Sequence, residues 1–275
     1  MNIKSVTAMY FSGTNTTKNM VTHIAENIAK ELKVPFSVID FSVPAQREKV
    51  TEFEKDEIVV FGTPVYAGRV PNLLLPYLNE NIKGNGAVAV PVVMFGNRAF
   101  DNALIELRTI LDNDGFRCVA AGAFVGEHSF SYVLGKGRPD AEDFSKADEL
   151  VKTAIERISH IDDEGSVTVP VPVPGDISVG YYKPHDRKNN FIDIRKVKPK
   201  TSDACDNCGL CADICPMGAI DHEDVTNVKG ICIKCGACIK RCPKGAKYYD
   251  DPGFLYHKEE LEAMFKDVRA ESVIF

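Results

Sequence analysis

Two copies of one cysteine-rich segment constrain this chain more than any other feature of its sequence. CDNCGLCADICPMGAI begins at Cys205 and CIKCGACIKRCPKGAK begins at Cys232, so the segment recurs after 27 residues. Each copy has the pattern C-x2-C-x2-C-x3-C-P. Eight of the nine cysteines lie between Cys205 and Cys242, and Cys118 stands apart. In a reducing compartment, such crowding predicts metal ligation rather than disulfides.

The spacing of these cysteines favours iron–sulfur clusters over zinc. Structural zinc usually takes two C-x2-C pairs separated by a longer loop, whereas each copy here has three ligands at three-residue steps and a fourth before proline. Residues 205–246 resemble the two-cluster bacterial ferredoxins, in which three close cysteines hold one 4Fe-4S cubane and the fourth crosses to the other. That resemblance implies one cluster on Cys205, Cys208, Cys211 and Cys242, and a second on Cys232, Cys235, Cys238 and Cys215.

Bulk properties of the sequence exclude some other classes of protein. A formal net charge of −6 over 275 residues argues against a nucleic-acid partner that depends on a positive field. No stretch approaches the roughly 20 apolar residues of a membrane span. Residues 1–11 lack the basic and apolar regions of a signal peptide. We therefore expect a cytoplasmic protein with no membrane span, in which Cys118 is a small apolar core residue.

Strand and helix patterns alternate through the first 160 residues. Apolar, β-branched runs predict strands at residues 3–11, 36–39, 57–62, 87–95 and 116–125, and helical spacing predicts helices at residues 17–32, 102–111 and 141–158. Because parallel neighbours need crossovers of a dozen or more residues, this alternation predicts a doubly wound, five-stranded parallel α/β sheet in residues 1–160. The loops after its strands, at Ser12, Thr63, Gly96 and Gly126, should border a binding crevice.

The composition changes after this α/β unit. Residues 161–200 are predicted to be an extended linker, because they contain Pro170, Pro172 and Pro174. Their basic part is expected either to pack its aromatic side chains on one domain or to dock an acidic redox partner. Residues 201–252 should form a small α+β, ferredoxin-like domain, and residues 253–275 a C-terminal amphipathic helix that packs on a domain or forms a homodimer contact.

A hydroxyl-rich turn joins the first predicted strand to the first helix. Backbone N–H groups, hydroxyls and a helix N-terminus at such a turn can hold a terminal phosphate. The turn resembles the flavodoxin phosphate-binding pattern S/T-x-T-G-x-T, although Asn15 stands where glycine is usual. Asn tolerates positive φ better than most residues, and the alternative is a simple helix cap. The residues of this turn are Ser12, Gly13, Thr14, Asn15, Thr16 and Thr17.

Two further loops resemble those that flank the isoalloxazine ring in flavodoxins. They comprise Pro64, Val65, Tyr66, Ala67 and Gly68 after the third strand, and Gly96, Asn97 and Arg98 after the fourth. Tyr66 is the first candidate for stacking on a flat cofactor, and Phe100 is the second. No G-x-G-x-x-G follows the first strand, which disfavours a dinucleotide. The resemblance, over residues 1–160, therefore implies FMN.

Three other side chains near these loops have two interpretations each. Arg69 and Arg98 either place positive charge near reduced flavin or are solvated surface residues. His128, in the loop after the fifth strand, is either a proton donor in the crevice or an exposed loop histidine.

Taken together, the two parts resemble the flavodoxin–ferredoxin fusion proteins of anaerobic bacteria and archaea. This resemblance implies an electron-transfer iron–sulfur flavoprotein that relays electrons between two 4Fe-4S clusters and FMN, and between redox protein partners. One alternative is an FMN-dependent reductase of a small-molecule acceptor, fed through the clusters, with residues 127–140 as a cover. Another is a redox sensor that binds no flavin. Whether the protein is an enzyme stays open at this point.

Overall fold

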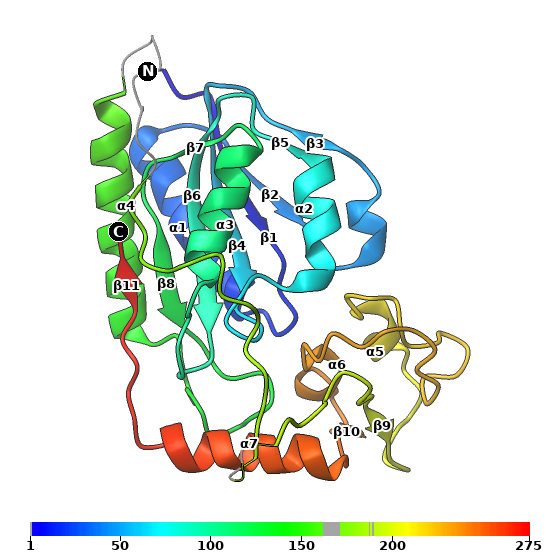
Figure 1. Cartoon of the computed structure of the whole chain (residues 1–275). Helices are drawn as coiled ribbons and strands as arrows, with labels where there is room; N and C mark the ends of the chain where they lie inside the picture. The colour runs from blue at the N-terminus through cyan, green and yellow to red at the C-terminus, as the bar shows by residue number, and fades with distance from the viewer. Residues whose placement is uncertain (1, 162–170, 187, 189) are drawn as a thin grey trace.

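The computed structural model describes residues 2–161, 171–186, 188 and 190–275. Within them, the larger unit is a seven-stranded sheet covered by helices on both faces (Figure 1). Its long parallel strands are β1 (Ser5–Tyr10), β2 (Phe36–Asp40), β4 (Glu57–Pro64), β6 (Val88–Phe95) and β8 (Gly122–Val125). They lie in the order β2-β1-β4-β6-β8, which is the flavodoxin order of doubly wound sheets. The predicted flavodoxin-like parallel sheet is confirmed.

Helices pack on each face of this sheet. The helices α1 (Thr16–Leu32) and α4 (Ala141–Ser159) cover one face, and α2 (Leu75–Asn81) and α3 (Ala103–Asn113) cover the other. All eight residues of β6 are consequently buried, as expected for a strand covered on both faces. The short elements beside them are η1 (Pro44–Arg47), β3 (Thr51–Glu52), η2 (Asn72–Leu74) and β5 (Ile82–Lys83).

The predicted strand at residues 116–125 is two strands. The first is β7 (Arg117–Cys118) and the second is β8, and both pair in parallel with β6. The register shifts by one residue between them, because Ala89 pairs with Cys118 whereas Val92 pairs with Gly122. Pro91 lies within this shift, and proline has no N–H to donate to a ladder.

The cysteine-rich part forms a small separate module beside the sheet (Figure 1). It contains β9 (Lys200–Thr201), α5 (Leu210–Asp213), α6 (Ala237–Lys240) and β10 (Lys247–Tyr248). The strands β9 and β10 pair antiparallel. After the module, α7 (Pro252–Phe265) runs across the end of the molecule toward which the sheet strands point.

Parts of the segment between the sheet and the module pack on the sheet unit, although most of its described residues are exposed. Val171 and Val173 belong to the core on the α3 face. The Tyr181 hydroxyl donates to the Val70 carbonyl at 2.9 Å, so an aromatic side chain of this segment rests on the sheet unit. Pro170 lies outside the described residues. No described helix has the length and apolar character that crossing a bilayer requires.

The C-terminal prediction was wrong beyond Phe265. The expected helix over residues 253–275 ends there, and the chain continues extended into β11 (Val273–Ile274), which pairs antiparallel with β8. A strand at a sheet edge presents unpaired N–H and C=O groups, and the β-branched end of the chain pairs with those of β8. We call residues 266–275 the C-terminal strap.

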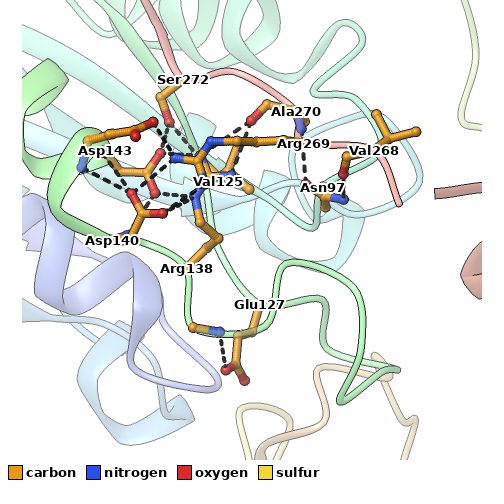
Figure 2. Close-up of polar contacts among 12 residues, drawn as sticks. Asn97, Val125, Glu127, Arg138, Asp140, Asp143, Val268, Arg269, Ala270 and Ser272 are labelled. Carbon is orange, nitrogen blue, oxygen red and sulfur yellow. Dashed lines mark hydrogen bonds and ion pairs between the residues drawn. The ribbon is translucent and has the colours of Figure 1, made fainter. Parts of the chain in front are cut away.

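Polar side chains fix the strap to the sheet unit (Figure 2). The Ser272 hydroxyl donates to Asp143 Oδ1 at 2.6 Å, and Arg138 Nη2 donates to the same oxygen at 2.5 Å. Arg138 also donates to the Ala270 carbonyl at 3.3 Å. The side chains of Arg138 and Asp143 are only 6% and 1% exposed, so this ion pair is buried.

Replacing Asp143 should destabilise the sheet unit strongly. An Asp143→Ala change leaves the Arg138 charge buried without its main partner, which costs about 3 kcal/mol. Lys146→Ala is the control: it removes a solvent-exposed pair with Glu149 and should cost less than about 0.5 kcal/mol. Chemical denaturation of both variants measures the difference, and equal losses would contradict the importance of the buried pair.

Candidate functional site

The two cysteine segments fold in the same way, position by position. In each, three residues adopt left-handed backbone conformations at equivalent places. These pairs are Asn207 (φ 56°) and Lys234 (φ 58°), Gly209 (φ 78°) and Gly236 (φ 73°), and Gly218 (φ 57°) and Gly245 (φ 58°). Non-glycine residues seldom adopt such values, so the sequence spacing alone did not reveal the roles of Asn207 and Lys234.

These turns direct backbone N–H groups at the sulfur atoms. The Asn207 N–H donates to Cys205 Sγ at 3.4 Å, and the equivalent Lys234 N–H donates to Cys232 Sγ at 3.4 Å. Hydrogen bonds of this kind stabilise thiolate ligands and tune the potential of a cluster. The duplicated sequence therefore gives duplicated ligand loops.

The structure brings each predicted ligand set together around one small cavity. Cys238 lies between the two cavities and lines both. The first cavity holds Cys205, Cys208, Cys211 and Cys242, and the second holds Cys215, Cys232, Cys235 and Cys238. Clustered thiolates suit iron–sulfur clusters, so the donor sets fit the cofactors that the sequence implied.

The two cavities differ in their exposure. Cys208 of the first set is exposed, whereas Cys235 and Cys238 of the second set are buried. Burial raises the pKa of the Cys235 thiol to about 12, so this sulfur is a neutral thiol unless a bound cation favours its thiolate.

A third cavity lies at the carboxyl ends of β1, β4, β6 and β8. This is the position that the doubly wound fold predicts for a ligand. We call it the crevice. Eight of the residues predicted to bind the cofactor line it: Gly13, Thr14, Thr16, Thr17, Pro64, Val65, Tyr66 and Gly96.

The hydroxyl-rich turn presents the start of α1 to this crevice. Asn15, the N-cap residue of α1, has φ 70° and no side-chain capping hydrogen bond within the described structure. The Ser12 hydroxyl, by contrast, accepts from the Lys18 N–H at 3.2 Å and closes the turn. The other N–H groups at the start of α1, beside the Thr14 and Thr16 hydroxyls, suit a phosphate group.

Tyr66 lies in the crevice wall, as the stacking prediction requires, and is half-buried. Burial, followed by the nearby Cys235 and Cys232 sulfurs, raises the pKa of its hydroxyl well above the usual value. The next two residues, Ala67 and Gly68, lie outside the lining. The Ala67 carbonyl accepts from the Tyr182 N–H at 2.8 Å.

The predicted roles of Asn97 and Arg98 at the flavin need correction. The Asn97 side chain is buried and binds the strap, donating to the Val268 carbonyl at 2.7 Å and accepting from the Ala270 N–H at 3.2 Å (Figure 2). Arg98 pairs with Asp101. Both side chains are therefore committed to contacts within the protein. Local sequence could not show those of Asn97, because the strap is remote in the chain.

Phe100 and Arg69 also have other partners. Phe100 packs on Phe95, with ring centroids 5.7 Å apart. Arg69 Nη2 lies 2.6 Å from Glu106 Oε1, and both side chains are nearly buried. Arg69 therefore contributes to the core of the sheet unit and is not a positive group beside the crevice.

His128 lines the crevice and is not an exposed loop histidine. Burial, with the positive charges of Lys240, His257 and Arg98, lowers its pKa to about 4. Its Nδ1 accepts from the Phe130 N–H at 3.1 Å. At neutral pH the ring is therefore uncharged, and it can offer a hydrogen bond from Nε2 but not a readily released proton.

Sequence reasoning missed one further residue of the crevice wall. Cys235, from the cysteine-rich module, lines the crevice as well as the second ligand cavity. A Cβ placed on Gly13 would lie only 3.0 Å from Cys235 Cβ, so the module packs directly on the predicted phosphate turn. No local signal in either segment indicates this contact.

Comparisons with known proteins treat the two parts separately. Residues 204–246 match the family model of a 4Fe-4S dicluster domain. A flavodoxin from the domain Archaea is 16% identical over 57% of this chain and 100% of its own, with a TM-score of 0.41. A Streptococcus pneumonia TIGR4 flavodoxin is 15% identical over 56% of this chain and 97% of its own, with a TM-score of 0.39.

A third similar structure is an apo NADH:FMN oxidoreductase, 16% identical over 61% of this chain and 95% of its own, with a TM-score of 0.41. The search of curated proteins gives no match. The strand order of the sheet, rather than these similarities, identifies the fold as flavodoxin-like.

Substitution of Asn15 should distinguish the contribution of the turn to FMN binding from its contribution to the stability of the protein. Valine at a left-handed position costs about 1–2 kcal/mol. Lys33, at the other end of α1, is also left-handed, with φ 58°. Asn15→Val and Lys33→Val should therefore lower the stability of the protein by similar amounts. Only Asn15→Val should also weaken FMN binding in a fluorescence titration, and Asn15→Gly should preserve it. An equal loss of FMN binding in Lys33→Val would contradict the assignment of the turn.

Proposed function

We propose that this protein is an iron–sulfur flavoprotein that relays electrons between two 4Fe-4S clusters and FMN, and exchanges them with redox protein partners. The observation that carries the proposal is the position of Cys235, which lines a cysteine cavity and the crevice at once. A ligand of one cofactor and the pocket of the other share a wall. Such a shared wall would keep the two cofactors close together, as electron transfer between them requires.

The crevice supports FMN as its ligand. The terminal phosphate would be held by the N–H groups at the start of α1 and by the Thr14 and Thr16 hydroxyls. Tyr66 offers an aromatic wall for the flat ring, and the neutral His128 offers a hydrogen bond.

The cysteine cavities support two clusters with crossed ligands. Cys205, Cys208 and Cys211 would hold one cluster together with Cys242, and the second copy of the motif would hold the other together with Cys215. Backbone N–H groups at the sulfur atoms would tune both potentials. The match of residues 204–246 to a 4Fe-4S dicluster domain supports this assignment.

When bound, FMN exchanges electrons singly or in pairs, whereas each cubane moves one at a time. The chain's own contribution is to hold the pockets together and to limit the access of water. The loop of residues 127–140 packs on α7, where the Ser131 hydroxyl donates to Glu262 Oε1 at 2.6 Å. This packing favours a carrier over a reductase with an open substrate pocket.

The exposure of Cys208 bears on where the protein acts. Exposed thiolates are the ones most readily oxidised. We therefore expect a reducing, oxygen-poor setting, such as the cytoplasm of an anaerobe.

Cofactor content tests the proposal directly. Anaerobically purified protein should contain about eight iron atoms, about eight sulfides and about one FMN per chain. Cys208→Ala and Cys235→Ala should each lower the iron content by about half, because each removes a ligand of one cluster. Cys118→Ala should keep the full iron content, because Cys118 lies buried in the sheet core.

Two other results would contradict the proposal. Zinc in place of iron and sulfide would contradict the clusters. Iron-replete protein without flavin would favour the redox sensor instead.

A further inference from the structure

We propose, on the basis of that function, that the module docks by its second cysteine repeat, so that the cluster of Cys215, Cys232, Cys235 and Cys238 faces FMN. The cluster of Cys205, Cys208, Cys211 and Cys242 is then the outer one, through which electrons reach the partner. In this orientation the bound cofactors would pass electrons one at a time between partner, outer cluster, inner cluster and FMN, which suits a one-electron redox protein as the partner. Gly236 and Lys240 determine this orientation.

The duplication alone leaves the orientation undetermined. Both repeats have the same ligand spacing and the same left-handed positions, so either cluster could in principle face the crevice. The selection must come from residues that do not bind iron and that differ between the repeats, in sequence or in surroundings.

Gly236 and Gly209 are equivalent in sequence but not in surroundings. A Cβ on Gly236 would lie 2.7 Å from the Ser129 carbonyl oxygen, whereas among the described residues no atom lies within 4 Å of a Cβ on Gly209. Ser129 belongs to the crevice wall. The second repeat therefore approaches the sheet unit as closely as a glycine permits.

Lys240 contributes a positive charge at a position where the first repeat has none. Its Nζ donates to the Ser131 carbonyl at 2.6 Å and lies 3.3 Å from Glu127 Oε2. The Lys240 side chain is only 9% exposed. The equivalent residue 27 positions earlier is Asp213, which is exposed. An aspartate in the place of Lys240 would be repelled by Glu127. This contact therefore favours docking by the second repeat and disfavours docking by the first.

A third contact supports the same orientation. Arg47, in η1, donates to the Pro216 carbonyl at 2.5 Å and to the Phe41 carbonyl at 2.9 Å. Pro216 directly follows Cys215, the ligand that crosses to the second set. The sheet unit thus touches the second cavity from two sides, while Cys208 of the first is exposed.

Two matched pairs of variants test the orientation in cofactor-loaded protein. After flash photoreduction of FMN, the rate at which the clusters bleach should fall about tenfold in Gly236→Ala and in Lys240→Glu, which each lose docking contacts. Gly86→Ala has a similar backbone cost, because Gly86 (φ 86°) is also left-handed but lies before β6, outside both ligand loops, and Lys200→Glu changes an exposed charge outside them. Both controls should keep the wild-type rate within about twofold.

A second readout does not depend on electron transfer. Amide hydrogen exchange in residues 127–132 should accelerate in Gly236→Ala and Lys240→Glu, because these residues lose their cover, but not in the controls. Equal rates and equal exchange in Gly236→Ala and Gly86→Ala would overturn the orientation while FMN and iron contents remain normal. Absence of FMN or iron from the wild-type protein would instead overturn the proposed function.

Discussion

The contact between Gly13 and Cys235 is the interaction on which the rest of the structure depends. Because a Cβ on Gly13 would lie 3.0 Å from Cys235 Cβ, the hydroxyl-rich turn of one unit and a cysteine of the other approach at backbone distance. The contacts of Gly236 with Ser129 and of Lys240 with Ser131 join the same two units. Electron transfer slows steeply with distance, so the value of each pocket depends on its nearness to the other.

The chain holds that contact by returning to its starting unit. After the module, α7 crosses below the sheet, and the strap adds β11 to the edge of β8. The buried pair of Arg138 and Asp143 and the amide of Asn97 fix the strap (Figure 2). A module connected only at its N-terminal side would be free to separate, whereas one connected at both sides has few alternative positions.

The sequence predicted those features that local residues determine. The parallel sheet follows from apolar runs such as residues 87–95, and the grouping of the cysteines around two cavities follows from the repeated C-x2-C-x2-C-x3-C-P spacing. Asn97 was assigned to the cofactor because it follows a strand end, yet its partners lie about 170 residues away in the strap. The pairing of Val273 and Ile274 is too short for any periodicity, and the docking of Cys235 depends on how two units meet.

Iron anomalous diffraction from crystals grown without oxygen would test the central claim most directly. Our account predicts two iron peaks, with the one among Cys215, Cys232, Cys235 and Cys238 nearer to flavin density that ends in a phosphate at the start of α1. A nearer peak among Cys205, Cys208, Cys211 and Cys242 would contradict it. So would a crevice without flavin beside fully occupied iron sites.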